Sequence, residues 1–139
     1  MKLSLSWIRD YVKIPDDMDL KKLAYDLTMS TVEVEDVEYL ARRFDKMVVG
    51  VIEKVEPHPN ADRLRVCKVD IGDGQIKEIV CGGINLRDGM RVAVACPGAM
   101  VRWHGEGEPV EIKNSKLRGV ESFGMICASD EIGLGDLFP

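Results

Sequence analysis

The sequence predicts an α+β N-terminal segment followed by an all-β barrel of five strands. Three observations carry this prediction. Apolar residues follow helical spacing early in the chain, they alternate with polar residues in short runs from residue 47 onward, and glycine- or proline-bearing turns separate these runs. The runs are 47–55, 64–71, 76–81, 91–96 and a fifth that begins at 110. Five short antiparallel strands in about 80 residues are typical of an OB-fold barrel, whereas a sandwich usually needs about seven.

The N-terminal domain, residues 1–43, is expected to contain a strand, two helices and a second strand. Alternating apolar residues open the chain, and β-branched residues return from Thr31. Between them, Ser6 and Asp19 are good N-caps for a short and a longer helix. In the longer helix the apolar residues fall on one face, and they are Leu20, Leu23, Ala24 and Leu27. Two short strands and two short helices make a thin core, so this piece is expected to dock on other protein.

The barrel domain is expected to span residues 44–128, and residues 129–139 are expected to begin a linker. In the first strand, Gly50 marks a place where the backbone can kink. The alternation predicts that one face of that strand is buried, formed by Met47, Val49, Val51 and Val55. In the run 64–71 the buried face changes phase midway, which predicts a β-bulge in that strand.

Composition and charge indicate a globular protein without a strong electrostatic bias. The chain has 139 residues, 45% hydrophobic and 31% charged, with a net charge of −5. Residues 47–128 carry equal numbers of basic and acidic side chains. A nucleic-acid partner would therefore be bound weakly and with steep salt dependence, through cations gathered on one face. The chain shows no apolar run of membrane-spanning length and no signal-peptide pattern, so the cytoplasm is the expected location.

The four cysteines are expected to be small buried hydrophobes in a reducing compartment. Cys67, Cys81, Cys96 and Cys127 lie far apart and form no C-x-x-C pair, the arrangement that preorganises half of a zinc site. No other spacing builds a nucleophile or a carboxylate pair. The sequence therefore predicts neither catalytic residues nor a metal site, and the chain by itself is not expected to be an enzyme.

Several motifs resemble the tRNA-binding domain that free-standing tRNA-binding proteins share with some methionyl-tRNA synthetases. They are PHPNADRL at 57–64, VCG at 80–82 followed by Asn85, and SKLRGVES at 115–122 followed by Gly124 and Met125. The opening MKLSLSWIRDYV, with Thr28, Met29 and residues 32–35, further resembles the β subunit of bacterial phenylalanyl-tRNA synthetase. The resemblance covers essentially the whole chain and implies an N-terminal fragment of that much longer subunit.

The resemblance also implies partners and cofactors. In that family an α2β2 assembly charges tRNA-Phe with phenylalanine, using ATP and magnesium. Aminoacylation belongs to the synthetase α subunit, so the implied role of this chain is non-catalytic tRNA binding without a cofactor of its own. Neither a membrane nor DNA is expected as a partner.

Candidate RNA contacts are the cations and polar groups on the predicted loops. The window 111–120 is the most basic ten-residue stretch of the barrel, with a net charge of +2. Phosphate contacts are expected from Arg63, Arg65, Lys113, Lys116 and Arg118, with Asn85 as a polar aid. Base stacking is a possibility for Trp103 and His58. The alternatives are that Trp103 plugs a barrel end and that His58 and Asn60 order the proline-flanked turn, with Asp62 accepting backbone N–H bonds.

Two other functions stay open at this stage. The scarcity of aromatic side chains favours recognition of the backbone of a folded RNA over single-strand reading. Together with the balanced charge, it also fits a structural or protein-interaction module of a synthetase, with little RNA contact. A free-standing tRNA-binding homodimer is the third possibility.

Overall fold

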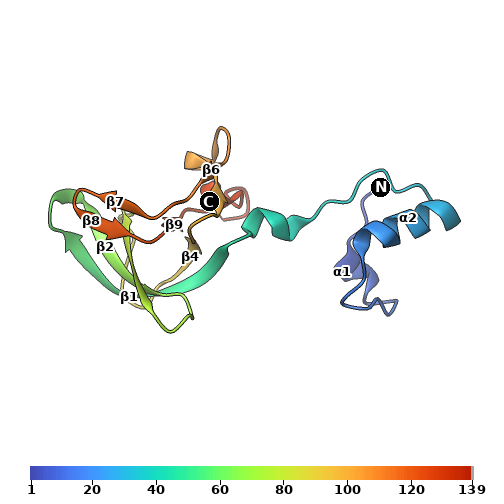
Figure 1. Cartoon of the computed structure of the whole chain (residues 1–139), viewed down its shortest axis with the longest axis horizontal. Helices are drawn as coiled ribbons and strands as arrows, with labels where there is room; N and C mark the ends of the chain where they lie inside the picture. The colour runs from blue at the N-terminus through green and yellow to red at the C-terminus, as the bar shows by residue number, and fades with distance from the viewer. Residues whose placement is uncertain (139) are drawn as a thin grey trace. The chain divides into compact units, whose positions relative to one another are not determined.

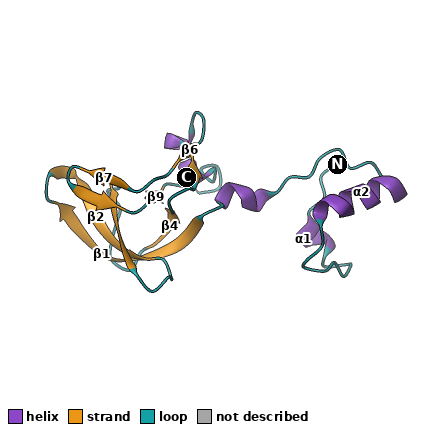
Figure 2. Cartoon of the chain, in the orientation of Figure 1, coloured by secondary structure: helices purple, strands orange, loops and turns teal. Residues whose placement is uncertain are grey.

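The computed structural model describes residues 1–138, which form two units (Figures 1 and 2). The first unit is Met1–Tyr39, and the second begins at Leu40. The first unit contains the helices α1 (Leu5–Ile8) and α2 (Leu20–Ser30). The second contains β1 (Met47–His58), β2 (Ala61–Asp70), β3 (Ile76–Cys81), β4 (Arg91–Ala95), β5 (Met100–Val101), β6 (Val110–Glu111), β7 (Ser115–Leu117), β8 (Val120–Ser122), β9 (Met125–Cys127), and the 3-10 turns η1 (Leu40–Phe44), η2 (Trp103–Gly105) and η3 (Asp130–Ile132).

The first unit is helical, and the two strands predicted for it are wrong. The carboxylate of Asp19 caps α2 by accepting hydrogen bonds from the backbone N–H groups of Lys21 and Lys22, at 2.9 and 3.4 Å, as predicted. The short helix α1 begins at Leu5 with Ser4 at its N-cap position, so Ser6 lies inside the helix. No strand forms within Met1–Tyr39, because an extended segment is stabilised only when another strand pairs with it.

The second unit is built on a five-stranded antiparallel sheet in the order β3-β2-β1-β4-β9. The four predicted strands before residue 97 are confirmed, with ends that move by a few residues. The predicted fifth strand does begin at Val110, but it is short and is not the fifth strand of this sheet. Val110–Glu111 pairs with Met100–Val101 in a separate two-stranded sheet, and Met125–Cys127 takes the edge position beside β4.

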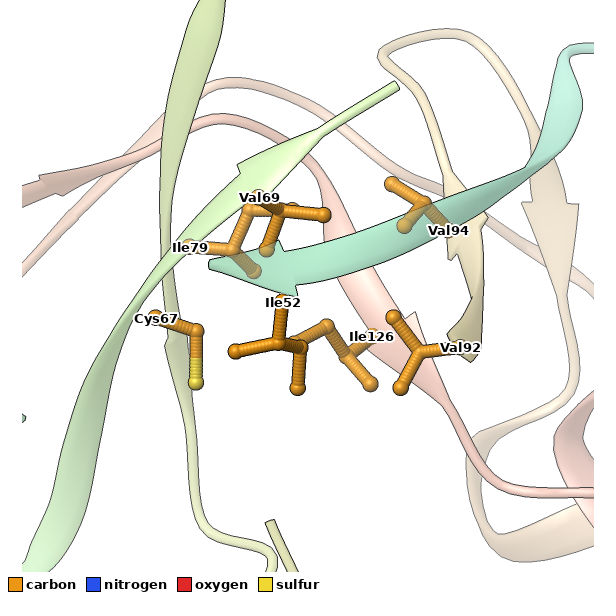
Figure 3. Close-up of a cluster of buried hydrophobic side chains, with 7 residues drawn as sticks. All are labelled: Ile52, Cys67, Val69, Ile79, Val92, Val94 and Ile126. Carbon is orange, nitrogen blue, oxygen red and sulfur yellow. The ribbon is translucent and has the colours of Figure 1, made fainter. Parts of the chain in front are cut away.

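One face of the five-stranded sheet carries the main hydrophobic core. Side chains from all five strands point toward one another in Figure 3, and they are Ile52, Cys67, Val69, Ile79, Val92, Val94 and Ile126. A second, smaller cluster packs Ala95, Ala99, Val101 and Ile112 beneath the β5–β6 sheet. These two clusters supply the apolar burial that stabilises the unit.

In the middle of β1 the buried face is the opposite of the one predicted, whereas the predicted Met47 and Val55 do pack against the two clusters. Val49 is 72% exposed, whereas Ile52 is fully buried. Gly50 lies opposite Val92 on the core-facing side, and a Cβ at Gly50 would come within 2.7 Å of the side chain of Val69. Because glycine adds nothing to a hydrophobic pattern, the alternation selected the other face of the strand.

The β-bulge predicted for the run 64–71 is wrong for that strand, and a bulge lies instead on the neighbouring strand β1. The register between β1 and β2 shifts between Ile52 and Lys54, which makes Glu53 the extra residue on β1. In β2, the adjacent residues Val66 and Cys67 are both buried, on opposite faces. The change of phase in 64–71 therefore reflects a strand that is covered on both sides.

The hairpin of β7 and β8 is joined to the outer edge of β3. The backbone N–H of Phe123 donates to the carbonyl of Glu78 at 2.8 Å, and the N–H of Val80 donates to the hydroxyl of Ser122 at 3.0 Å. Ser122 is buried and donates in turn to the carbonyl of Gly124. These bonds satisfy part of the edge of β3 and position the β7–β8 hairpin against the sheet.

Candidate nucleic-acid interface

Two tight turns, far apart in the sequence, meet at one end of the sheet. One joins β1 to β2 and the other joins β7 to β8, each with two residues between its last paired positions. The Nε2 atom of His58 lies 3.0 Å from the carbonyl oxygen of Leu117, and the side-chain amide of Asn60 donates to the carbonyl of Arg118 at 2.9 Å. Figure 1 shows β7 and β8 at the end of the sheet where β1 turns into β2. The two most distinctive motifs of the sequence therefore form one surface.

The β7–β8 turn has an unusual backbone. Arg118 and Gly119 have φ values of 47° and 95°, which is the pattern of a two-residue type I′ hairpin turn. Gly119 adopts this conformation without cost. Arg118 is a long side chain at a position that asparagine, aspartate or glycine usually occupies, so it is held in a strained conformation.

His58 supports the turns from inside. The residue is only 5% exposed, and its Nδ1 accepts a hydrogen bond of 3.0 Å from the backbone N–H of Asn60. Because Nδ1 accepts, the proton is on Nε2, which donates to Leu117. With both nitrogens used and the ring buried, the geometry agrees with the turn-ordering alternative and leaves no ring face open to a base.

The two arginines of β2 lie beside the first turn. Both are exposed, as their position opposite Leu64 and Val66 predicts. The Nη1 atom of Arg65 reaches the carbonyl of Leu64 at 3.2 Å and that of Asp62 at 3.4 Å. In the part of the chain that the structure describes, the guanidinium of Arg63 makes no hydrogen bond or ion pair.

The second turn adds two more cations. Lys116 lies opposite Glu121 in the β7–β8 ladder and is exposed, as is Arg118. Neither side chain forms an ion pair or a hydrogen bond with any residue among 1–138. We use the name turn surface for the two turns together with the exposed side chains of Arg63, Arg65, Lys116 and Arg118.

Asn85 lies in the loop that follows β3. That loop leaves the sheet beside β2, where a Cβ at Gly82 would lie 3.8 Å from the side chain of Leu64. The side-chain oxygen of Asn85 lies beside Gly83. The loop therefore starts next to the turn surface.

Lys113 and Trp103 belong to a different part of the unit. Lys113 follows β6, with its ammonium 3.8 Å from a carboxylate oxygen of Glu111. Trp103 lies in η2, which packs against η3, and the N–H of Arg102 donates to the carbonyl of Glu131 there. The indole is 56% exposed and meets the ring of His104 edge-on, with centroids 5.6 Å apart. Because β5 and β6 are antiparallel, Trp103 after β5 and Lys113 after β6 lie beyond opposite ends of this ladder.

The phenylalanine rings offer little stacking surface. The guanidinium of Arg43 lies 4.7 Å from the ring centroid of Phe44, and the ammonium of Lys77 lies 5.0 Å from that of Phe123. Both rings are engaged in cation–π contacts. The exposed side chains that define the turn surface are cations and include no aromatic ring.

Asn60, which the sequence suggests only as a residue that orders the first turn, also connects this turn to the second one. It does so through its side-chain amide. An asparagine directly after Pro59 in a tight turn is a recognisable turn signal, but that pattern does not show which carbonyl 58 residues away its amide reaches.

The cysteines are free thiols that pack in or against the hydrophobic clusters. Burial raises the pKa of the Cys67 thiol to about 11, and burial does the same for Cys127. Burial also raises the pKa of Cys81 and Cys96. These thiols stay protonated at neutral pH, which makes them weak nucleophiles and poor metal ligands.

Residues 1–138 show neither a metal-binding cluster nor a membrane-spanning helix. They contain no group of three or more histidine, cysteine, aspartate or glutamate side chains placed to hold a metal ion. Neither of the helices there has both the length and the apolar composition needed to cross a membrane.

The chain belongs to the family described as "Putative tRNA binding domain", whose model matches residues 47–137. The match includes the whole five-stranded sheet, both turns and every cation of the turn surface. The class of protein that the fold and the turn surface define is thus the tRNA-binding domain.

The similar curated proteins belong to one kind of enzyme subunit. The phenylalanine–tRNA ligase β subunit of Cupriavidus pinatubonensis is 45% identical over 98% of this chain. The β subunits of Coxiella burnetii and Chlorobaculum tepidum are each 46% identical over 98% of the chain. The chain spans only 16 to 17% of the length of these relatives.

Among solved structures, the crystal structure of the C-terminal domain of Plasmodium vivax p43 is similar at 27% sequence identity. The superposition has a TM-score of 0.44 and covers 58% of this chain and 43% of that one.

Proposed function

We propose that this chain binds tRNA without catalysing a reaction, and that the turn surface makes the contact. The observation that carries the proposal is the joining of the two turns by His58 and Asn60, which gathers exposed cations of β2 and β7–β8 at one end of the sheet. Arginines and lysines without a protein partner are available to phosphate oxygens. The family to which the chain belongs supports RNA of the transfer class as the ligand.

Phosphate contacts are assigned in this proposal to Arg63, Arg65, Lys116 and Arg118, with Asn85 at the margin. Lys113 and Trp103, which follow opposite ends of the β5–β6 ladder, are proposed as two further and separate contacts. Because the charges of the unit balance, affinity depends on the local gathering of cations and falls steeply with salt.

The proposed fold is an OB-type barrel in residues 44–128, closed where the β7–β8 hairpin meets β3. The hydrogen bonds from Phe123 to Glu78 and from Val80 to Ser122 support this closure. Residues 1–43 form a separate N-terminal domain and residues 129–139 begin a linker in this proposal.

We further propose that the chain is a region of a phenylalanine–tRNA ligase β subunit in the cytoplasm. Its likeness to curated β subunits over nearly its whole length supports this assignment. The complete enzyme would be an α2β2 assembly that charges tRNA-Phe, and ATP and magnesium would act on the α subunit. In such an assembly the first unit would complete its core against other protein, because none of its residues is buried here.

The proposal is tested by filter binding at low salt with this chain and two RNAs of equal length. One is tRNA, and the other is a scrambled sequence without stable structure. The chain is expected to retain tRNA better than the scrambled RNA, with affinity that falls as salt rises. Equal retention of both RNAs would contradict the proposal.

A second candidate is a structural or protein-interaction module with little RNA contact. The equal numbers of basic and acidic side chains in residues 47–128 favour it. The combined substitution Lys116→Ala and Arg118→Ala, made in the full ligase, separates the two functions. Aminoacylation at low tRNA concentration falls if the turn surface binds tRNA, and it stays level if the module is structural.

A further inference from the structure

We propose that His58 and Asn60 are positioning residues that hold the β7–β8 turn in the conformation in which Arg118 meets RNA. The inference rests on the proposed tRNA binding and goes beyond it, because neither residue is expected to touch RNA. The two side chains act on successive carbonyls of the turn, those of Leu117 and Arg118.

The contacts account for the strained backbone of Arg118. Its φ of 47° places a long side chain in the left-handed region, a strained conformation that persists only where neighbouring contacts enforce it. His58 binds the carbonyl of Leu117, the residue before Arg118, at 3.0 Å, and Asn60 binds the carbonyl of Arg118 itself at 2.9 Å. The peptide groups on both sides of Arg118 are therefore held. A Cβ at Gly119 would lie 3.4 Å from the amide nitrogen of Asn60, so the turn and the amide are also closely packed.

The residue types match the task. His58 must accept at one nitrogen and donate at the other, which a neutral imidazole does. Its burial removes competition from water, so these hydrogen bonds are costly to break. Asn60 offers the amide donor that the carbonyl of Arg118 needs. The prolines on either side of His58 restrict the first turn and thereby fix the origin of both bonds.

This arrangement affects RNA binding because the guanidinium of Arg118 has no partner in the described chain. Its direction depends on the backbone of the turn. A turn held in one conformation loses less entropy when RNA binds, which increases affinity without an additional contact.

The test is a double-mutant cycle on the full chain, with tRNA affinity measured by fluorescence anisotropy. Asn60→Ala removes the bond to Arg118 and is expected to weaken binding about 3- to 10-fold, the effect of one lost hydrogen bond. In a chain that already carries Arg118→Ala, Asn60→Ala is expected to change affinity by less than about 2-fold, because Asn60 acts on RNA only through the side chain of Arg118. His58→Gln keeps one donor and one acceptor and is expected to retain more affinity than His58→Ala.

Thermal unfolding of each variant is the control that it still folds. The conformation of the turn is followed through 15N relaxation of the Gly119 amide. Asn60→Ala is expected to increase fast motion of this amide. An unchanged Gly119 amide, or an equal loss of affinity with and without Arg118, would overturn the positioning role while tRNA binding by the unaltered chain stands. Absence of tRNA binding by the unaltered chain would instead overturn the proposed function, and this inference with it.

Discussion

The two units of this chain show what separates a well-formed helix from a stable domain. In the first unit, α2 has a capping carboxylate and one apolar face, yet no residue of Met1–Tyr39 is buried. In the second unit, many strands are only two or three residues long, yet two hydrophobic clusters lie among them. Local signals are sufficient to form an element, but stability requires apolar surface from elements distant in sequence.

The largest expected effect comes from deleting a core side chain of the second unit. Ile52→Ala should lower the free energy of unfolding by about 2–5 kcal/mol, because a fully buried side chain leaves a cavity. The matched control is Leu27→Ala on α2, where the side chain is 37% exposed and the loss should be less than about 1 kcal/mol. Urea unfolding followed by circular dichroism measures both. Similar losses would show that the first unit has a core of its own.

A glycine comparison examines packing inside the second unit. Gly50→Ala should destabilise it by about 1–3 kcal/mol, since the new methyl would lie 2.7 Å from Val69 and 3.0 Å from Val94. Gly82→Ala is the control, because its methyl would meet nothing closer than 3.8 Å. The control should shift the unfolding midpoint little. An equally small shift of the unfolding midpoint for Gly50→Ala would contradict the close packing of Gly50 against β2 and β4.

Charge removal compares the units as RNA-binding surfaces. Lys116→Ala with Arg118→Ala should weaken tRNA binding about tenfold or more and reduce the slope of log affinity against log salt by about 1.5. Lys21→Ala with Lys22→Ala removes the same charge from α2 in the first unit. Filter binding at several salt concentrations should show little change for this second pair. Equal losses would mean that net charge, and not the turn surface, determines binding.

The smallest effect is expected from exposed ion pairs, which both units contain. Lys54 and Lys68 lower the pKa of Glu56 by hydrogen bonding and by charge. The stabilisation from this carboxylate is present above its ordinary pKa of 4.5 and is lost as the pH falls through the lower pKa of the folded state.

The variant Glu56→Gln tests this pH dependence. Its melting temperature should lie slightly below that of the unaltered chain at pH 7, with the difference vanishing in acid. Asp26→Asn, which breaks the 2.6 Å pair with Lys22 on α2, is the counterpart in the first unit. A difference that grows in acid would contradict the direction of the Glu56 shift.

Sequence patterns predicted the strands better than the faces of the strands. The runs that became β1 to β4 were visible because apolar alternation and glycine turns are local properties. The burial of Val49 and Val51 in β1 was predicted incorrectly because Gly50, which packs against the core, contributes no hydrophobicity. The strand beside β4 was also missed, since Val110 and Met125 carry equally good local signals and only pairing distinguishes them.

The candidate site was predictable as a set of residues but not as a surface. Arg63, Lys116 and Arg118 were selected from motif and charge, and the structure places them at the turns. Lys113 was selected on the same grounds and lies beside Glu111 instead. Nothing in the spacing of Asn60 indicated its bond to the carbonyl of Arg118.

By itself, the sequence determined the helix at Asp19, the first four strands, the positions of the tight turns and the membership of a tRNA-binding family. The tertiary structure decided which face of β1 is buried, which segment borders β4 and which cations share a surface. The division has a physical reason. Turn and alternation signals depend on a few neighbouring residues. The buried face, the strand order and the shared surface depend on long-range contacts, such as those of His58 with Leu117 and of Asn60 with Arg118, which are 59 and 58 positions apart in the sequence.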